Sequence, residues 1–167
     1  MSLDMRVPAI DVVVESPSWV PDAEAIVRRA LVEAATALGA DFRNCVTVAL
    51  LTDDAALARL NAQWRGIDAP TNVLSFPAAP QLAAASESAA RPLGDIAIAW
   101  ETTAREARDE GKPLAHHLSH LAVHGFLHLV GYDHESDTQA ETMEQLERAI
   151  LQRLGVPDPY LTHEIGV

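Results

Sequence analysis

The stretch HGFLHLVGYDH, residues 124–134, places three histidines in a mostly apolar segment. His124 and His128 are four residues apart, so on a helix their side chains share one face, with Cβ atoms about 5–6 Å apart. Gly131 follows, and a glycine in the left-handed conformation at that point ends a helix. The chain can then turn back and bring His134 toward the other two imidazoles. The spacing therefore predicts a metal-binding helix whose third ligand arrives from the turn that follows it.

Three imidazoles are a ligand set that suits zinc, which binds histidine nitrogen at about 2.0–2.1 Å. Three protein ligands leave the fourth position open, as in catalytic rather than structural zinc sites. His120 also lies four residues from His124, but it is about 12 Å from His128 along a helix axis, too far to share one ion. We therefore expect one Zn²⁺ per chain, or another transition metal, bound by His124, His128 and His134.

The spacing H-x-x-x-H-x-x-G-x-x-H is that of the metzincin peptidases, with one departure. Those enzymes carry a glutamate general base directly after the first histidine, where this chain has Gly125. The pattern indicates a metal-dependent hydrolase that is not an ordinary protease. A metallopeptidase-like enzyme or a small-molecule metal hydrolase stays as an alternative. Without that glutamate, proton removal would fall to metal-bound hydroxide, to bulk water, to a hydroxyl group of the substrate itself or to a carboxylate elsewhere in the chain.

Length and composition indicate a single soluble domain over residues 1–167. The N-terminal segment lacks the apolar core of a secretory signal, and no apolar run approaches the roughly 20 residues of a membrane span. The single cysteine, Cys45, is expected to be a buried, reduced thiol in a cytoplasmic protein. A net charge of −12 argues against a broad nucleic-acid-binding face. Any phosphate contact would then come from a local patch around Arg59, Arg65 and Lys112.

The pattern of apolar residues predicts four strands, which partly alternate with helices before helices dominate the last third of the chain. The third strand is expected at a sheet edge because prolines bound it. The small residues of 78–92 are expected to form a mobile surface loop. This order of elements favours a single α+β or α/β domain. The predicted strands are 10–15, 45–52, 72–76 and 95–100, and the predicted helices are 21–38, 53–64, 101–111, 113–130 and 137–154.

Several segments together resemble the YbeY family of bacterial endoribonucleases, which act in ribosomal RNA maturation. They are VHGFLHLVGYDH (123–134), LNAQWRGIDAPTNVLSFP (60–77), LGDIAIAW (93–100), EGKPLAHHLSHLAVHG (110–125) and LGVPDPY (154–160). The resemblance covers nearly the whole chain and implies an α+β domain. In it, helices pack against a mixed four-stranded sheet and a zincin-like helix binds the metal through His124, His128 and His134.

The resemblance also implies a function: a single-strand-specific, metal-dependent endoribonuclease in ribosomal RNA processing and ribosome maturation or quality control. Its substrate would be single-stranded RNA in or near the small ribosomal subunit, and its partners the ribosome or ribosome-associated proteins. Neither DNA nor a membrane is expected as a partner. A non-enzymatic ribosome-assembly factor with a structural metal is the remaining alternative. A structural zinc site usually has four protein ligands. Cys45 is a poor candidate for the fourth, because it lies far from the histidines in an early predicted strand.

The family's functional arginine falls on Arg65, so the resemblance implies a catalytic role for it. A guanidinium fork suits the charge on phosphate oxygens. Ser75 and Asp95 lie in segments that look like family motifs, and each is a candidate substrate contact or an ordinary strand or turn residue. Asp133 is a candidate to orient a ligand imidazole or to cap the turn. His116 and His117 are expected to be exposed, and the three tryptophans are expected to pack against the core.

Overall fold

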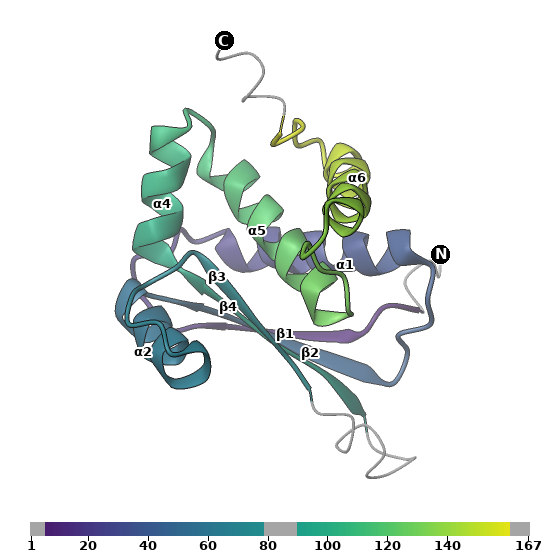
Figure 1. The fold of residues 1–167 in the computed structure, drawn as a ribbon, viewed down its shortest axis with the longest axis horizontal. Helices are drawn as coiled ribbons and strands as arrows, with labels where there is room; N and C mark the ends of the chain where they lie inside the picture. The colour runs from purple at the N-terminus through teal and green to yellow at the C-terminus, as the bar shows by residue number, and fades with distance from the viewer. Residues whose placement is uncertain (1–5, 79–89, 161–167) are drawn as a thin grey trace.

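The computed structural model describes residues 6–78 and 90–160 of the chain. Over these residues the chain forms one mixed sheet with helices on both of its faces (Figure 1). This α+β arrangement confirms the expected fold class. The elements, in chain order, are β1 (Ala9–Val14), α1 (Ala23–Leu38), β2 (Cys45–Thr52), α2 (Asp54–Arg65), β3 (Val73–Pro77), β4 (Arg91–Ala99), α4 (Trp100–Asp109), α5 (Leu114–Leu129) and α6 (Asp137–Arg153).

The strands lie in the order β1-β2-β4-β3. β1 and β2 pair in parallel, as do β2 and β4, whereas β3 runs antiparallel to β4. Along β2 buried residues alternate with half-buried ones, because successive side chains point to opposite faces of the sheet. β3 is an edge strand, as expected from Pro77, since a proline cannot donate to a ladder of hydrogen bonds. One side of β3 is therefore open to the surroundings.

Helices α1 and α5 cover one face of the sheet and form the main core with it. Figure 1 shows α5 crossing above the sheet, with α1 behind it and α4 and α6 on either side. Phe126 and Leu127 of α5 are fully buried, as are Leu31 of α1 and Ile96 of β4. Burial on this scale, at about 25 cal/mol per Å² of apolar surface, is the main favourable term that fixes α5 in place.

Helix α2 lies on the opposite face of the sheet (Figure 1). There Leu57 packs against Leu74 and Ala97 in a smaller apolar cluster. Asp53 caps the helix, since its carboxylate accepts a hydrogen bond from the backbone N–H of Ala56 at 2.9 Å. The two faces are thus covered unequally, and β3 lies between α2 on one side and α5 on the other.

Strand β4 begins at Arg91, four residues earlier than the sequence pattern predicted. The expected loop 78–92 was therefore too long at its C-terminal end, and its residues 79–89 lie outside the described residues. Gly94 explains how this stretch enters the sheet: its φ of +135° is favoured by glycine, and a Cβ there would lie 2.3 Å from the carbonyl oxygen of Phe76. In the part of the chain that is described, no helix is long and apolar enough to span a membrane.

Candidate metal centre

A stripe of histidines runs along the one face of α5 that the core does not cover. His120, His124 and His128 follow at intervals of four residues, and each is partly exposed. Most of the neighbouring positions of α5 are apolar and buried against α1, the sheet, α4 and α6, and the polar His117 and Ser119 are buried with them. All three histidines line the cleft beside β3. The i, i+4 spacing thus places them on one open side of a helix that is otherwise buried.

Helix α5 ends as the sequence predicted. Gly131 has a φ of +109°, and its N–H donates to the carbonyl of His128 at 3.1 Å. The N–H of Tyr132 reaches back to the carbonyl of Leu127 at 2.9 Å, which closes the last turn. The chain then reverses, and His134 returns to the face that carries His128.

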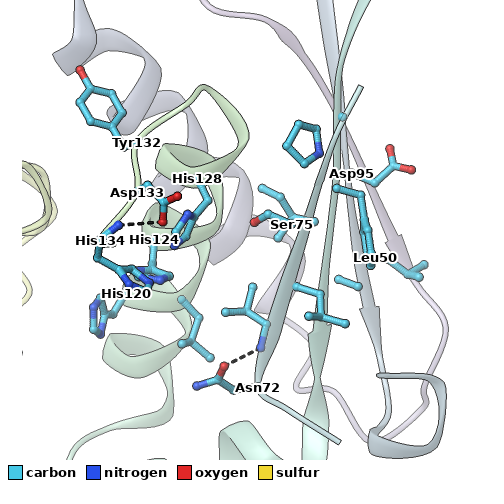
Figure 2. Close-up of a pocket in the computed structure, with 18 of the residues that line it drawn as sticks. Leu50, Asn72, Ser75, Asp95, His120, His124, His128, Tyr132, Asp133 and His134 are labelled. Atoms are coloured by element: carbon cyan, nitrogen blue, oxygen red, sulfur yellow. Dashed lines mark hydrogen bonds between the residues drawn. The ribbon is translucent and has the colours of Figure 1, made fainter. Parts of the chain in front are cut away.

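His124, His128 and His134 face one another across this turn (Figure 2). Their ring centroids are 4.7 Å apart for His124 and His128, 5.0 Å for His128 and His134, and 5.9 Å for His124 and His134. One nitrogen from each ring lies within 4.8 Å of the other two. Tetrahedral zinc would hold such nitrogens about 3.3 Å apart, so small side-chain shifts suffice. The three residues fit a metal ion in donor type and in position.

The environment of His128 favours its neutral form. Burial lowers the pKa of His128, and the neighbouring His124 and His134 lower it further, while Asp133 opposes them. Only a neutral imidazole has a lone pair to offer a metal. The surroundings of His128 therefore favour the neutral imidazole that a metal ion binds.

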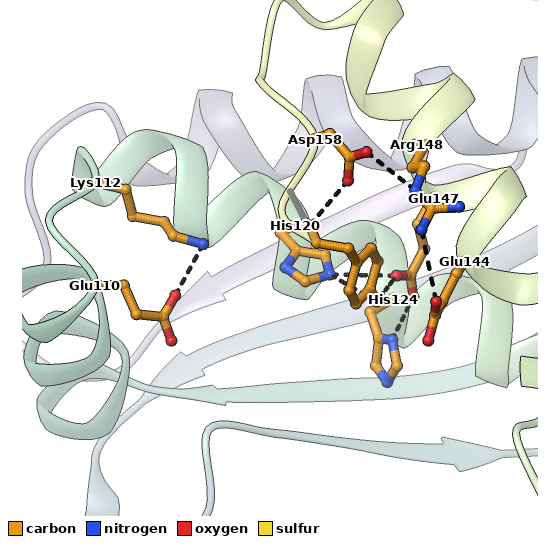
Figure 3. Close-up of polar contacts among 9 residues, drawn as sticks. Glu110, Lys112, His120, His124, Glu144, Glu147, Arg148 and Asp158 are labelled. Atoms are coloured by element: carbon orange, nitrogen blue, oxygen red, sulfur yellow. Dashed lines mark hydrogen bonds and ion pairs between the residues drawn. The ribbon is translucent and has the colours of Figure 1, made fainter. Parts of the chain in front are cut away.

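Glu147 on α6 holds His124 from behind. Its carboxylate is fully buried and accepts a hydrogen bond from Nδ1 of His124, which leaves Nε2 of that ring for a ligand role (Figure 3). Its other oxygen lies 3.3 Å from Nε2 of His120. Burial alone would raise the pKa of Glu147, but the hydrogen bonds from His120 and His124 outweigh it and hold that pKa to about 2. Glu147 is thus an ionised carboxylate that fixes a tautomer, as in many carboxylate–histidine–metal arrangements.

The segment after α6 completes this network. The hydroxyl of Tyr160 donates to the Glu147 carboxylate, and burial followed by the Glu147 contact raises the pKa of Tyr160. Arg148 holds the segment in place through an ion pair with Asp158 at 3.1 Å (Figure 3). Its guanidinium also lies 5.3 Å from the centroid of the Tyr160 ring, within cation–π range. Two elements beyond the histidine motif therefore orient His124.

A second group of possible ligands, His120, His124 and Glu147, also has atoms within 4.8 Å of one another. It shares His124 with the first group, and Glu147 uses its oxygens on the two histidines and on Tyr160. These hydrogen bonds already account for the arrangement without an ion. The trio of His120, His124 and His128 is not gathered into one group in the described chain, in agreement with the helix geometry.

Ser75 ties the edge strand to α5. Its hydroxyl donates to the backbone carbonyl of Gly125 at 2.8 Å. A Cβ at position 125 would lie 2.9 Å from Cγ2 of Ile96 and 3.3 Å from Oγ of Ser75. Gly125 therefore faces the sheet at a distance that a larger residue cannot reach without displacing its neighbours. The position that holds a glutamate base in metzincins is here a packing contact between α5, β3 and β4.

Arg65 is the last residue of α2 and is exposed, and it lines the same cleft as the histidines. Within the described residues it takes part in no ion pair, so its guanidinium is available to an anion. Lys112 also lines the cleft, but it pairs with Glu110 at 2.8 Å (Figure 3). Arg59 is exposed and is not among the cleft residues. Of the three residues expected to form a basic patch, only Arg65 both lines the cleft and has no ion-pair partner among the described residues.

The other candidate residues have different positions. The Asp133 carboxylate accepts the backbone N–H of His134 at 2.7 Å, so it caps the turn (Figure 2). Asp95 pairs with Phe76 in the β3–β4 register and points away from the histidines. The prediction that His117 is exposed was wrong: it is 4% exposed, and its Nε2 lies 2.8 Å from Glu106. His116 is half-buried.

Glu147 and Tyr160 were not identified from the sequence. A signal for Glu147 was present, because it falls on the buried stripe of α6 with Met143, Ile150 and Leu151. A glutamate on an apolar stripe is rarely buried without a partner. Pairing that stripe with the histidine stripe of α5 would have brought Glu147 to His124. Tyr160 ends the segment LGVPDPY that resembles the family, but no pattern of residues gave it a role at the site.

Comparisons with known proteins show the family to which the chain belongs. The family model described as Endoribonuclease YbeY matches residues 15–155. A protein named Endoribonuclease YbeY from Rhodopseudomonas palustris (strain BisA53) is 59% identical over 155 residues, which cover 92% of this chain and 90% of the relative. Another of that name from Bradyrhizobium sp. (strain BTAi1) is 54% identical over 161 residues, 95% of each chain.

Among solved structures, the solution structure of TM1509 from Thermotoga maritima is similar, with a TM-score of 0.53. The match covers 90% of this chain and 98% of that chain at 22% sequence identity. At that identity the likeness supports the fold alone.

Proposed function

Since this chain belongs to the Endoribonuclease YbeY family, we propose that it is a metal-dependent endoribonuclease specific for single-stranded RNA. The observation that carries this proposal is a single cleft lined by three converging imidazoles and by the guanidinium of Arg65, which has no ion-pair partner among residues 6–78 and 90–160. A metal and a group that binds phosphate can together stabilise the charge that develops in phosphodiester hydrolysis.

His124, His128 and His134 would hold the metal, which we propose to be one Zn²⁺ per chain because imidazole nitrogens suit zinc. When bound, zinc supplies Lewis acidity that activates water and polarises a phosphoryl oxygen. Glu147 keeps His124 in the tautomer that presents Nε2. Ser75 holds α5 against β3, so that the histidine stripe keeps its place beside the edge strand.

Arg65 would bind the scissile phosphate. A guanidinium offers two parallel N–H donors to two phosphate oxygens, which an ammonium cannot do. Neutralising charge on the phosphate is the main demand of phosphodiester cleavage, whereas peptide hydrolysis needs a general base that also protonates an amine. Gly125 offers no such base, and its contacts with Ile96 and Ser75 leave no room for one. These points favour RNA over a peptide as substrate.

The biological substrate would be ribosomal RNA of the small subunit, in ribosomal RNA processing and ribosome maturation in the cytoplasm. A chain with a net charge of −12 gains little from general attraction to RNA. A ribosome or a ribosome-associated protein would then supply part of the affinity and bring the RNA to the cleft. Arg65 would provide a local phosphate contact within the cleft.

The experiment that tests the proposal compares two substrates on one preparation. Protein purified without chelator is analysed for metal and then incubated with a single-stranded RNA and with an unstructured peptide. We expect about one zinc per chain, RNA cleavage that a chelator abolishes and added zinc restores, and an intact peptide. Chelator-sensitive cleavage of the peptide with RNA left intact would overturn the proposal.

A further inference from the structure

Trp64 does not pack in the core, contrary to the prediction for the three tryptophans. Its relative exposure is 64%, compared with 6% for Trp19. Among the described residues it is the most exposed of the large apolar side chains, ahead of Ile67 at 49%. An indole left in water at this level loses the burial that usually accounts for a tryptophan. The exposed indole of Trp64 is therefore a candidate surface for a ligand that covers the ring.

Phe76 supports the Trp64 ring from the sheet. The two ring centroids are 6.2 Å apart, with an angle of 58° between the planes. Phe76 follows Ser75 on β3, so the two side chains point to opposite faces of that strand. Ser75 meets α5 on the face with the histidines, and Phe76 meets Trp64 on the α2 face. Only the edge strand β3 separates the aromatic pair from the metal site.

The backbone around Trp64 is held firmly. Gly66 ends α2 with a φ of +71°, and its N–H donates to the carbonyl of Ala62 at 3.2 Å. The N–H of Ile67 returns to the carbonyl of Asn61 at 3.2 Å. The buried side-chain amide of Asn61 donates to the carbonyl of Ala69 at 2.9 Å and braces the following turn. A ring mounted in this way loses little conformational freedom when a ligand stacks on it.

We propose that Trp64, supported by Phe76, is a stacking subsite for an unpaired nucleobase of the RNA substrate. The subsite rests on the proposed function, because it lies beside Arg65 in the cleft that also holds the histidines. Arg65 binds a phosphate, and Trp64 binds a base of a neighbouring nucleotide as the strand crosses the β3 edge. Every base has a flat π face, so the subsite selects unpaired over paired RNA without selecting a sequence.

The charge of the chain supports this occupant. Contacts to phosphate weaken as the salt concentration rises. In this chain the Lys and Arg side chains are outnumbered by Asp and Glu, which gives a net charge of −12. Stacking on an aromatic ring involves no release of counterions and is not opposed by the acidic surface. Trp64 thus supplies affinity for RNA that does not depend on the charge of the surface.

A binding experiment separates the two contributions. The metal-loaded protein is titrated with a single-stranded 2′-O-methyl RNA of about twelve nucleotides, near the site sizes usual for single-strand binders, at several salt concentrations. We expect Trp64→Ala to weaken binding by about 5- to 150-fold at every salt concentration, with an unchanged salt slope. Trp64→Phe should restore most of the affinity. Arg65→Ala should instead make the plot of the logarithm of the binding constant against the logarithm of salt concentration less steep, by about 0.7 in slope.

The matched control is Val13→Ala, which shortens a 43% exposed apolar side chain on β1, at the other edge of the sheet. It should bind RNA as the unaltered protein does. Equal affinities for Trp64→Ala and the unaltered protein would overturn the subsite, as would a loss of affinity in Val13→Ala as large as in Trp64→Ala.

A cleavage experiment locates the subsite on the substrate. Abasic ribonucleotides are placed one at a time along a single-stranded RNA, and kcat/KM is measured for each. In the unaltered protein one position near the cut should show a clear penalty, and in Trp64→Ala that penalty should disappear because the ring is already gone. Identical abasic profiles would overturn the subsite while cleavage itself stands. Binding that depends on Trp64 in a protein that cuts no RNA would overturn the proposed function and leave the subsite standing.

Discussion

The buried carboxylate of Glu147 on α6 accepts a hydrogen bond from Nδ1–H of His124 on α5. The contact joins two helices, and it determines which nitrogen of His124 faces the cleft. Ring orientation at the candidate metal centre thus depends on a residue outside the histidine motif.

Replacing Glu147 should weaken metal binding without removing a ligand. We expect Glu147→Gln to lower zinc affinity by about 10- to 100-fold, because the neutral amide oxygen accepts the Nδ1 hydrogen bond of His124 more weakly and raises the basicity of the ring less than a carboxylate does. Competition with a chromogenic chelator measures the change. Glu144→Gln is the matched control, since Glu144 lies one turn earlier on α6 and contacts Arg148 at 3.7 Å instead of a histidine. Equal zinc affinities for the two variants would contradict the role given to Glu147.

Removing one of the three histidines should abolish both metal binding and activity. We expect His128→Ala to lose the bound zinc and RNA cleavage together, because two imidazoles are left to hold the ion. The unaltered protein should gain about 2.7 kcal/mol of stability when free zinc reaches 100 times its Kd, and His128→Ala should gain far less. Thermal unfolding with and without zinc measures this. His116→Ala is the control on the same helix, and a zinc-dependent gain in His128→Ala equal to that of His116→Ala would refute the assignment.

Arg65 should matter for chemistry and not for stability. We expect Arg65→Ala to abolish RNA cleavage while the free energy of unfolding changes by less than about 0.5 kcal/mol, since the side chain is exposed. Arg65→Lys should restore only part of the rate, because an ammonium lacks the bidentate fork. Metal content should stay at the unaltered level in both variants. Loss of zinc from Arg65→Ala would instead show that the residue supports the fold of the site.

Introducing the metzincin glutamate should not create a better hydrolase. We expect Gly125→Glu to leave RNA cleavage no higher than before and to destabilise the protein by about 1–3 kcal/mol, because the new side chain meets Ile96 and Ser75. Gly125→Ala serves as the control for the Cβ alone, and it should show a smaller loss of stability in urea unfolding. A rise in the rate of RNA or peptide hydrolysis in Gly125→Glu would mean that position 125 reaches the reacting atoms.

Local patterns were enough to predict most elements of the fold. The predicted bounds of β2 agree with the structure, and those of α5 agree to within a residue, because each has a clear run of apolar residues and a recognisable end. The start of β4 was missed because Pro92 and Gly94 are usually breakers of regular structure. The strand tolerates both where its register against β2 shifts, next to Thr47.

The candidate site divides in the same way. The positions of His124, His128 and His134 follow from one helix and one glycine turn, so their approach could be predicted from eleven neighbouring residues. The placing of Glu147 depends on how α6 packs against α5, which no local pattern encodes. The exposure of Trp64 likewise depends on how much of the sheet α2 covers, which the sequence does not reveal.

The dependence of His124 on Glu147 also means that the parts of the candidate metal centre leave the ribosome at different times. Residues 124–134 emerge together and carry all three histidines. Glu147 comes 23 residues after His124, and Tyr160 a further 13 residues later. A nascent chain that stops within the first turns of α6 therefore has the histidines without the carboxylate that orients them. The candidate metal centre thus gains its three histidines from one short segment, and the carboxylate that orients His124 only when α6 packs against α5.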